Sequence, residues 1–280
     1  MNSRLVCDVR GDGLPVLCLH GHPGSRQCMR VFTTPLSQYC QTIAPDFRGY
    51  GGSKTSRPFE MRQHLMDIVD LLDAMQISEV VVLGWSLGGI IGTELALTYP
   101  QRVEGLILVA SAAHPVSDHP PLTWRDYLFT LAASIFNRLR PGLSWNRRYF
   151  GQRSLYRYLI QNHSKGAYQH LAREAWPAFF NTSRYAHQAL NRALRAGYNR
   201  LGDLDKISCP TLVLAGECDR HITMAASLKT YQALPNSEWI SYPQTAHLFP
   251  WEVPNQVNCD IRRWLHHHFG APQAESADAS

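Results

Sequence analysis

Residues 79–92 constrain the fold of this chain more than any other stretch. They begin with a short apolar, β-branched run at 80–83, which is typical of a fully buried central strand. They end with a second apolar run at 90–97, which has the length and composition of a buried helix. Only a few residues separate the two runs, so the chain must turn sharply between a strand and a helix.

This turn has the pattern Gly-x-Ser-x-Gly, with Ser86 at its apex. Residues two positions from such an apex must be small because larger side chains would collide, and Gly84 and Gly88 meet that requirement. Ser86 would then project its hydroxyl from the sheet, beside a helix N-terminus that favours developing negative charge. The bare pattern arises by chance in about one chain in ten of this size, so its meaning depends on the flanking strand and helix.

Strands and helices alternate from residue 15 to residue 110. This predicts an α/β protein with a mostly parallel central sheet and helices on both faces. Gly11 and Gly13 separate the first two expected strands, at 3–9 and 14–19, and predict that these strands form a hairpin. Further strands are expected at 41–46, 80–83, 105–110, 209–216 and 237–242, and helices at 61–75, 223–234 and 254–269.

The alternation stops between residues 114 and 200, where the sequence is rich in arginine and aromatic residues and indicates helices only. We therefore expect one sheet domain, formed by 1–113 and 204–270, which is interrupted by a helical insertion at 114–203. The small, polar residues at 271–280 are expected to form a disordered tail.

Composition narrows the class of protein further. No stretch approaches 18 apolar residues, so no transmembrane segment is expected, and the first residues lack the apolar region of a signal peptide. The seven cysteines are odd in number and scattered, which indicates reduced thiols in the cytoplasm rather than a disulfide framework. No metal-binding pattern or Walker A loop is present, and we expect no metal and no organic cofactor.

A serine hydroxyl is a weak nucleophile at neutral pH and needs a base, which in turn needs a carboxylate to orient it. In a strand–turn–helix architecture the acid and then the histidine follow the serine, each just past the end of a strand. Asp219 follows the apolar run that ends at Gly216, and His247 follows the run that ends at Tyr242. The sequence therefore predicts a catalytic triad of Ser86, Asp219 and His247.

A tetrahedral intermediate also needs two backbone N–H donors for its oxyanion. Leu87, directly after Ser86, is expected to supply one of them. His22 lies in the loop after the expected strand at 14–19, where the second donor belongs, and its backbone N–H is the predicted donor. Whether the His22 imidazole also contacts substrate stays open.

Taken together, these motifs resemble those of the α/β-hydrolase-fold serine hydrolases, over about 3–113 and 204–269. The matching strings are His-Gly-x-Pro at 20–23, Asp-x-Arg-Gly-x-Gly-x-Ser at 46–53, Gly-x-Ser-x-Gly-Gly at 84–89, Gly-x-x-Asp at 216–219 and Ala-His-x-x-x-x-Glu-x-Pro at 246–254. The resemblance implies an esterase or carboxylesterase with a nucleophile elbow at Ser86. It also implies that the helical insertion is a cap over the active site.

The same resemblance bears on the reaction. Haloalkane dehalogenases and epoxide hydrolases of this family carry aspartate where this chain has Ser86, which argues against both activities. The Gly-Trp-Ser-Leu-Gly-Gly string is similar to that of carboxylesterases that release methyl esters from acyl-carrier-protein substrates. We expect hydrolysis of carboxylic ester or thioester bonds in a small-to-medium acyl substrate, through an acyl-enzyme. A carbon–carbon bond hydrolase, a perhydrolase and a non-catalytic protein that binds a small ligand stay open as alternatives.

Charge is unevenly distributed along the chain. Residues 121–200 hold thirteen Lys and Arg against two Asp and Glu, a net +11, whereas the rest of the chain has a net −6. This basic segment is either a solvated surface or a landing site for an acidic partner, such as an acyl carrier protein, a CoA ester or an anionic membrane surface. Residues 124–139 add apolar side chains at helical spacing, which we interpret as cap interior or pocket lining, with a helix in a membrane interface as the alternative. Nucleic acid is not an expected partner because no recognised binding motif is present.

Overall fold

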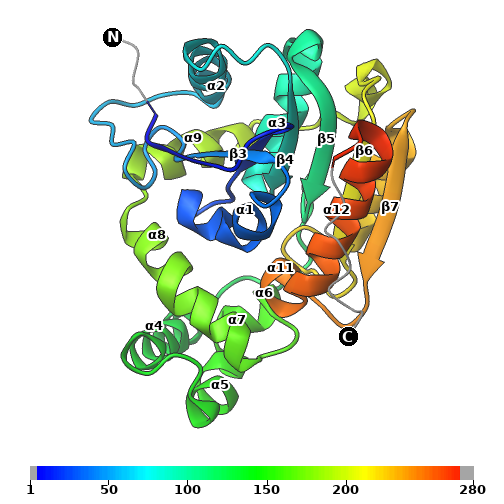
Figure 1. Cartoon of the computed structure of the whole chain (residues 1–280). Coiled ribbons are helices and arrows are strands. Elements are labelled where there is room, and N and C mark those ends of the chain that lie inside the picture. The colour runs from blue at the N-terminus through cyan, green and yellow to red at the C-terminus, as the bar shows by residue number, and fades with distance from the viewer. Residues whose placement is uncertain (1–4, 272–280) are drawn as a thin grey trace, which may run out of the picture.

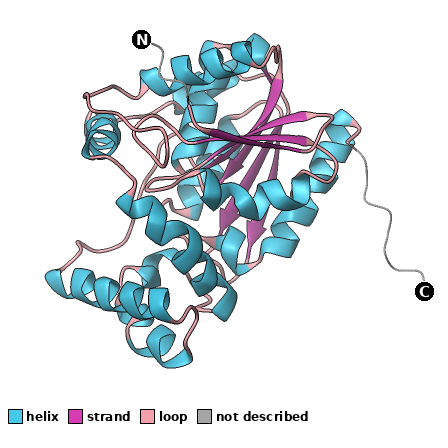
Figure 2. Cartoon of the chain, turned by 60° about the vertical axis from the view of Figure 1, so that its left-hand side comes forward, coloured by secondary structure: helices cyan, strands magenta, loops and turns pink. Residues whose placement is uncertain are grey.

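The computed structural model of the 280-residue chain describes residues 5–271. A central sheet of seven strands has the order β1-β3-β2-β4-β5-β6-β7. The strands are β1 (Cys7–Arg10), β2 (Pro15–Leu19), β3 (Gln41–Pro45), β4 (Val80–Trp85), β5 (Val103–Val109), β6 (Thr211–Gly216) and β7 (Ser237–Tyr242). All neighbouring strands are parallel except β1 and β3. Helices cover both faces of the sheet (Figures 1 and 2), which confirms the predicted fold class.

The predicted hairpin between the first two strands is wrong. β1 pairs antiparallel with β3, and β3 separates β1 from β2. The glycine-containing loop passes over the start of β3, and a Cβ at Gly11 would come within 2.3 Å of the carbonyl oxygen of Cys40. Gly11 therefore serves a close backbone crossing, whereas Gly13 adopts a positive φ of 85°, and both features favour glycine as a tight hairpin does.

The helices around the sheet follow the predicted alternation. They are η1 (Arg26–Met29), α1 (Arg30–Leu36), α2 (Arg62–Ala74), α3 (Leu87–Thr98), η2 (Pro100–Arg102), η5 (Leu201–Lys206), α10 (Met224–Ala233), α11 (Phe249–Glu252) and α12 (Pro254–Phe269). Side chains along β4 alternate between two cores. Val81 and Leu83 pack in the core under α1 and α12, whereas Val80 and Val82 pack in the core under α2 and α3. Burial on both faces explains why β4 is apolar without a break.

Between β5 and β6 the described chain contains helices and no strand, as predicted. Before η5 these helices are α4 (Trp124–Leu139), α5 (Ser144–Tyr149), η3 (Gly151–Arg153), α6 (Tyr156–Leu159), α7 (Lys165–His170), the π-helical turn η4 (Leu171–Ala175), α8 (Trp176–Phe180) and α9 (Arg184–Arg195). In Figure 1, α4, α5 and α7 lie together at the lower end of the molecule, away from most of the sheet, and α9 returns beside the core. The division into a core and a cap at 113/114 and 203/204 stays a prediction.

The end of the described chain is packed. Ala271 is buried, and its carbonyl oxygen lies 2.8 Å from Nδ1 of His266. The remainder of the predicted tail, 272–280, lies outside the described residues. Within 5–271, none of the helices combines the length and the apolar run that crossing a membrane requires.

Candidate active site

Ser86 occupies the turn between β4 and α3 with a backbone φ of 54°, which is unusual for a residue with a side chain. The glycines around it allow this turn. A Cβ at Gly84 would lie 2.4 Å from the carbonyl oxygen of Gly88, and one at Gly88 would lie 2.0 Å from that of Leu19. The backbone N–H of Ser86 donates to Val109 at 2.9 Å, which ties the turn to β5. The strained conformation is thus held by close packing on both sides.

His247 lies between Ser86 and Asp219. Its Nε2 is 3.1 Å from Oγ of Ser86, and its Nδ1 is 2.8 Å from Oδ2 of Asp219. The other carboxylate oxygen of Asp219 accepts the backbone N–H groups of His221 and Ile222, at 2.8 and 3.0 Å. All three side chains of the predicted triad are buried. The ends of β4, β6 and β7 therefore bring the three residues into one hydrogen-bonded series.

Glu252 holds the loop that carries His247. Its Oε1 accepts the backbone N–H of Ala246 at 2.9 Å, and its Oε2 accepts those of Gln161 and Asn162. Burial raises the pKa of Glu252, and these three N–H donors oppose that shift by stabilising the carboxylate. One carboxylate thus connects the histidine loop to the helical segment between β5 and β6.

One predicted oxyanion residue adjoins Ser86, and the loop that carries the other one reaches it. Leu87 follows it in the chain and is the first residue of α3. The loop of His22 contacts it through Gly21, where a Cβ would lie 3.3 Å from Cβ of Ser86. The role of the two backbone N–H groups as oxyanion donors stays a prediction.

The imidazole of His22 is held in place and uncharged. Its Nδ1 lies 2.8 Å from the hydroxyl of Tyr50, and its ring meets that of His187 edge-on, with centroids 4.6 Å apart. Burial, with a smaller contribution from the nearby His187, lowers the pKa of His22 to about 3. At neutral pH, His22 therefore brings a polar but neutral ring to the site.

His221 is a site residue that the sequence did not single out. Its ring meets that of His247 edge-on at 4.7 Å and stacks parallel to that of His119 at 6.2 Å. Burial is the main cause that lowers the pKa of His221 to about 3, and His247 adds to the shift. The one sequence signal for His221 was its position two residues after Asp219, because the loop that carries the acid must lie beside the histidine of the triad.

A cavity of about 440 Å³ opens above Ser86, and its lining is mostly apolar. The loops of the sheet contribute Gly21, His22, Pro23, Gly24, Cys28, Trp85, Ser86, His221, His247, Leu248 and Trp251. The helical segment contributes Tyr127, Thr130, Leu131, Ser134, Leu155, Tyr156, Leu159, Leu171, Ala175, Trp176, Phe179 and Phe180. The cavity therefore lies between the sheet and the helices that interrupt it, with the predicted nucleophile on its wall.

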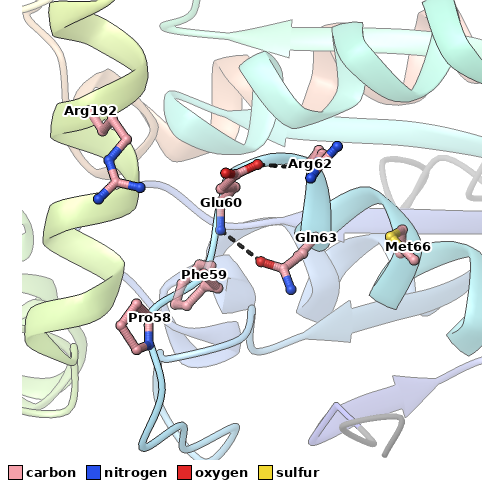
Figure 3. Close-up of a pocket in the computed structure, with 7 residues that line it drawn as sticks. All are labelled: Pro58, Phe59, Glu60, Arg62, Gln63, Met66 and Arg192. Carbon is pink, nitrogen blue, oxygen red and sulfur yellow. Dashed lines mark hydrogen bonds and ion pairs between the residues drawn. The ribbon is translucent and has the colours of Figure 1, made fainter.

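A second, more open concavity of about 570 Å³ lies beside the start of α2 and next to α9 (Figure 3). Its lining residues are Pro58, Phe59, Glu60, Arg62, Gln63, Met66 and Arg192. Glu60 pairs with Arg62 at 3.0 Å, and its backbone N–H donates to Gln63 at 2.7 Å. None of these side chains is a serine, cysteine or histidine, so the cavity above Ser86 is the candidate active site.

Residues 15–254 match the family model described as the alpha/beta hydrolase fold. The chain is 26% identical to the uncharacterized hydrolase YugF of Bacillus subtilis over 258 residues, which cover 89% of each chain. It is 25% identical to a pimeloyl-[acyl-carrier protein] methyl ester esterase of Vibrio campbellii over 266 residues, 92% of this chain and 97% of that one. A solved thermophilic esterase from Thermogutta terrifontis matches with a TM-score of 0.70 and 26% identity, over 94% of this chain and 93% of that one. The chain belongs to the α/β-hydrolase-fold family.

Proposed function

We propose that the protein is a serine hydrolase that cleaves carboxylic ester or thioester bonds of small-to-medium acyl substrates. The hydrogen-bonded series of Ser86, His247 and Asp219 on the wall of an apolar cavity carries this conclusion. Ester hydrolases among the relatives agree with it.

The reaction begins when His247 takes the proton of the Ser86 hydroxyl as Oγ attacks the acyl carbonyl. Asp219 keeps the proton on Nδ1 of His247 and stabilises the imidazolium that forms. The imidazolium then gives its Nε2 proton to the departing alkoxide or thiolate, which leaves an acyl-Ser86 ester. Water attacks that ester with His247 again as the base, and the carboxylic acid departs as the Ser86 hydroxyl is restored.

The oxyanion of each tetrahedral intermediate accepts the backbone N–H groups of Leu87 and His22. The contact between Gly21 and Ser86 supports this assignment because it keeps the His22 loop against the nucleophile. The hydrogen bond between the His22 ring and the Tyr50 hydroxyl fixes the same loop from the other side.

The helical segment 114–203 acts as a cap, and its apolar side chains form the acyl pocket. Leu131, Leu159 and Leu171 line the cavity from this segment. Three hydroxyls of this wall are bonded within the segment: that of Ser134 pairs with that of Tyr156 at 2.6 Å, and that of Thr130 donates to the carbonyl oxygen of Asp126 at 2.6 Å. An acyl chain would therefore meet a wall with few free polar groups.

Two further parts of the proposal concern the surroundings of the enzyme. An acyl carrier protein or a CoA ester, as the carrier of the acyl substrate, is the acidic partner that the Vibrio relative suggests. A reducing compartment such as the cytoplasm is supported by the seven cysteines, all of which are free thiols.

Labelling with a fluorophosphonate probe tests the function directly. Wild type should react covalently, Ser86→Ala should not, and the matched control Ser208→Ala, at an exposed serine outside the cavity, should label like wild type. Hydrolysis of p-nitrophenyl esters of increasing acyl length should then show an optimum set by the pocket. A folded wild type that neither labels nor hydrolyses would favour the ligand-binding alternative.

A further inference from the structure

Helix α4 has the opposite polarity to an ordinary surface helix. Its buried residues include Asp126, Ser134 and Asn137. Its solvent face carries large apolar side chains that are 43–72% exposed: Trp124, Leu128, Leu131, Ile135 and Leu139. Their spacing of three or four residues places them in one stripe along the helix. A helix in this orientation exposes the face that would ordinarily be buried.

The buried polar side chains fix this orientation. Asp126 pairs with Arg157 at 2.6 Å, and the hydroxyls of Ser134 and Tyr156 lie 2.6 Å apart. Asn137 bonds two backbone groups of neighbouring segments. Turning the apolar stripe inward would break these bonds and leave buried polar groups without partners, at about 1–3 kcal/mol for each. The apolar face is therefore held toward solvent.

The same apolar surface reaches the mouth of the cavity. Phe179 and Phe180 at the end of α8 are 54% and 64% exposed, and Tyr127 on α4 is 57% exposed. These three side chains and Leu131 also line the cavity above Ser86. Exposed apolar side chains gathered in this way mark a surface that binds something.

The charge around this surface has one sign. Asp126 and Glu174 are the only acidic residues at 121–200, both are buried, and each has a basic partner, Arg157 and His170 respectively. Exposed arginines accompany the apolar stripe: Arg125, Arg138, Arg140, Arg148 and Arg153. The exposed charge is complementary to an anionic partner.

We propose that this α4 surface, formed by the apolar stripe, Phe179, Phe180 and the five arginines, docks on an anionic lipid bilayer. The apolar side chains would enter the boundary between headgroups and acyl chains, and the arginines would contact lipid phosphates. Trp124 and Tyr127 have the ring types that are enriched at this depth. An acidic carrier protein would match the arginines but would not by itself account for the apolar stripe.

Docking in this orientation turns the cavity mouth toward the bilayer. In Figure 1, α4 and α5 form the lower end of the molecule, away from most of the sheet. Entry of acyl esters from the bilayer rests on the proposed function, whereas docking itself does not. A Ser86→Ala variant should therefore bind vesicles as wild type does, which separates failure of one proposal from failure of the other.

Vesicle flotation tests the docking surface. We expect the full chain to float with phosphatidylcholine vesicles that contain about one third phosphatidylglycerol and to bind pure phosphatidylcholine much less. The triple variant Leu128→Gln, Ile135→Gln, Leu139→Gln changes no cavity-lining residue and keeps good helix formers. It should lower the partition coefficient at least about tenfold. Replacing Arg138 and Arg140 by Gln should lower it comparably at low salt and less at high salt.

A matched control replaces two exposed apolar residues on other helices, Met66→Gln on α2 and Leu194→Gln on α9. It should bind like wild type, and thermal unfolding verifies that each variant is folded. Trp124 provides a measurement that needs no destabilised variant. Its emission, obtained by difference from Trp124→Phe, should shift to shorter wavelength with anionic vesicles.

Three results would overturn the proposal. The first is a wild-type protein that does not bind anionic vesicles. A wild-type dimer that the triple variant converts to a monomer, without vesicle binding, would assign the stripe to a second copy of the chain. Arginine-dependent binding of an acyl carrier protein, without vesicle binding, would assign the surface to an acidic protein.

Discussion

Glu252 accepts the backbone N–H of Ala246 at 2.9 Å, immediately before His247. The other oxygen of the same carboxylate accepts two backbone N–H groups from residues 161 and 162. This side chain thus positions the histidine loop and fastens it to the helices above the cavity, although it does not itself touch Ser86.

Replacing Glu252 by Ala should lower kcat about ten- to a hundredfold with a smaller effect on KM, because His247 loses its fixed distance to Ser86. Stability should fall by about 1–3 kcal/mol as the backbone groups lose their acceptor. Glu252→Gln retains one acceptor oxygen and should recover part of kcat. Ester kinetics and urea unfolding measure both effects, and a loss of stability with unchanged kcat would reduce Glu252 to a structural role.

The turn at Ser86 should tolerate no side chain at position 88. A Cβ on Gly88 would lie 2.0 Å from the carbonyl oxygen of Leu19, so the backbone would have to move. Gly88→Ala should therefore lose about 2–3 kcal/mol of stability or fail to fold, and any folded fraction should label slowly with a fluorophosphonate. Gly202→Ala is the matched control because its Cβ would enter open space. Equal behaviour of the two variants would contradict this account of the turn.

Local signals predicted much of the fold and of the candidate site. The apolar run of β4, the turn glycines and the acid and histidine past two later strands are each readable within a few residues. The sequence did not indicate which strand pairs with β1, because that strand, β3, lies more than thirty residues further along the chain. Glycine marks close backbone approach, and a hairpin is only one of its forms.

The orientation of α4 was equally hidden from the sequence. Its apolar spacing predicts a helix with an apolar face, and such a face is ordinarily buried. The choice between inward and outward depends on Arg157, Tyr156 and the backbone near Tyr168, which bond its polar face from later segments. The prediction of cap interior or pocket lining therefore holds for Tyr127 and Leu131 as cavity lining, and is wrong for Leu128 and Leu139, which are exposed and do not line the cavity.

Acid should destabilise the protein through histidines that fold in the neutral form. His64 is fully buried among Phe47, Tyr50 and Phe59, and neither of its ring nitrogens has a hydrogen-bond partner among the described residues. Burial lowers the pKa of His64 to about 3 from an ordinary value of 6.5. As pH falls below 6.5 the unfolded state binds the proton first, so stability is complete above pH 6.5 and declines down to about pH 3.

Replacing His64 by Leu should remove this contribution. Keeping His64 neutral lowers the free energy of unfolding at pH 5 by about 2 kcal/mol relative to pH 8, because each pH unit below 6.5 costs about 1.4 kcal/mol. Urea unfolding at both pH values should show that His64→Leu raises the free energy of unfolding by about 2 kcal/mol more at pH 5 than at pH 8. The exposed His114→Leu should change stability equally at both. A His64→Leu effect that is the same at both pH values would mean that folded His64 binds the proton at pH 5 as readily as the unfolded chain does, which would contradict this account.

Ala175, at the end of the π-helical turn η4, should limit acyl length. Ala175 lines the same cavity as Ser86, and a larger side chain there would occupy space proposed for the acyl chain. Ala175→Phe should lower kcat/KM for eight-carbon and longer p-nitrophenyl esters at least about tenfold, and change that for acetate less than about threefold. Ala196→Phe, at an exposed residue outside the cavity, is the matched control and should leave both unchanged. An equal loss for short and long esters in Ala175→Phe would show that the acyl chain does not pass this wall.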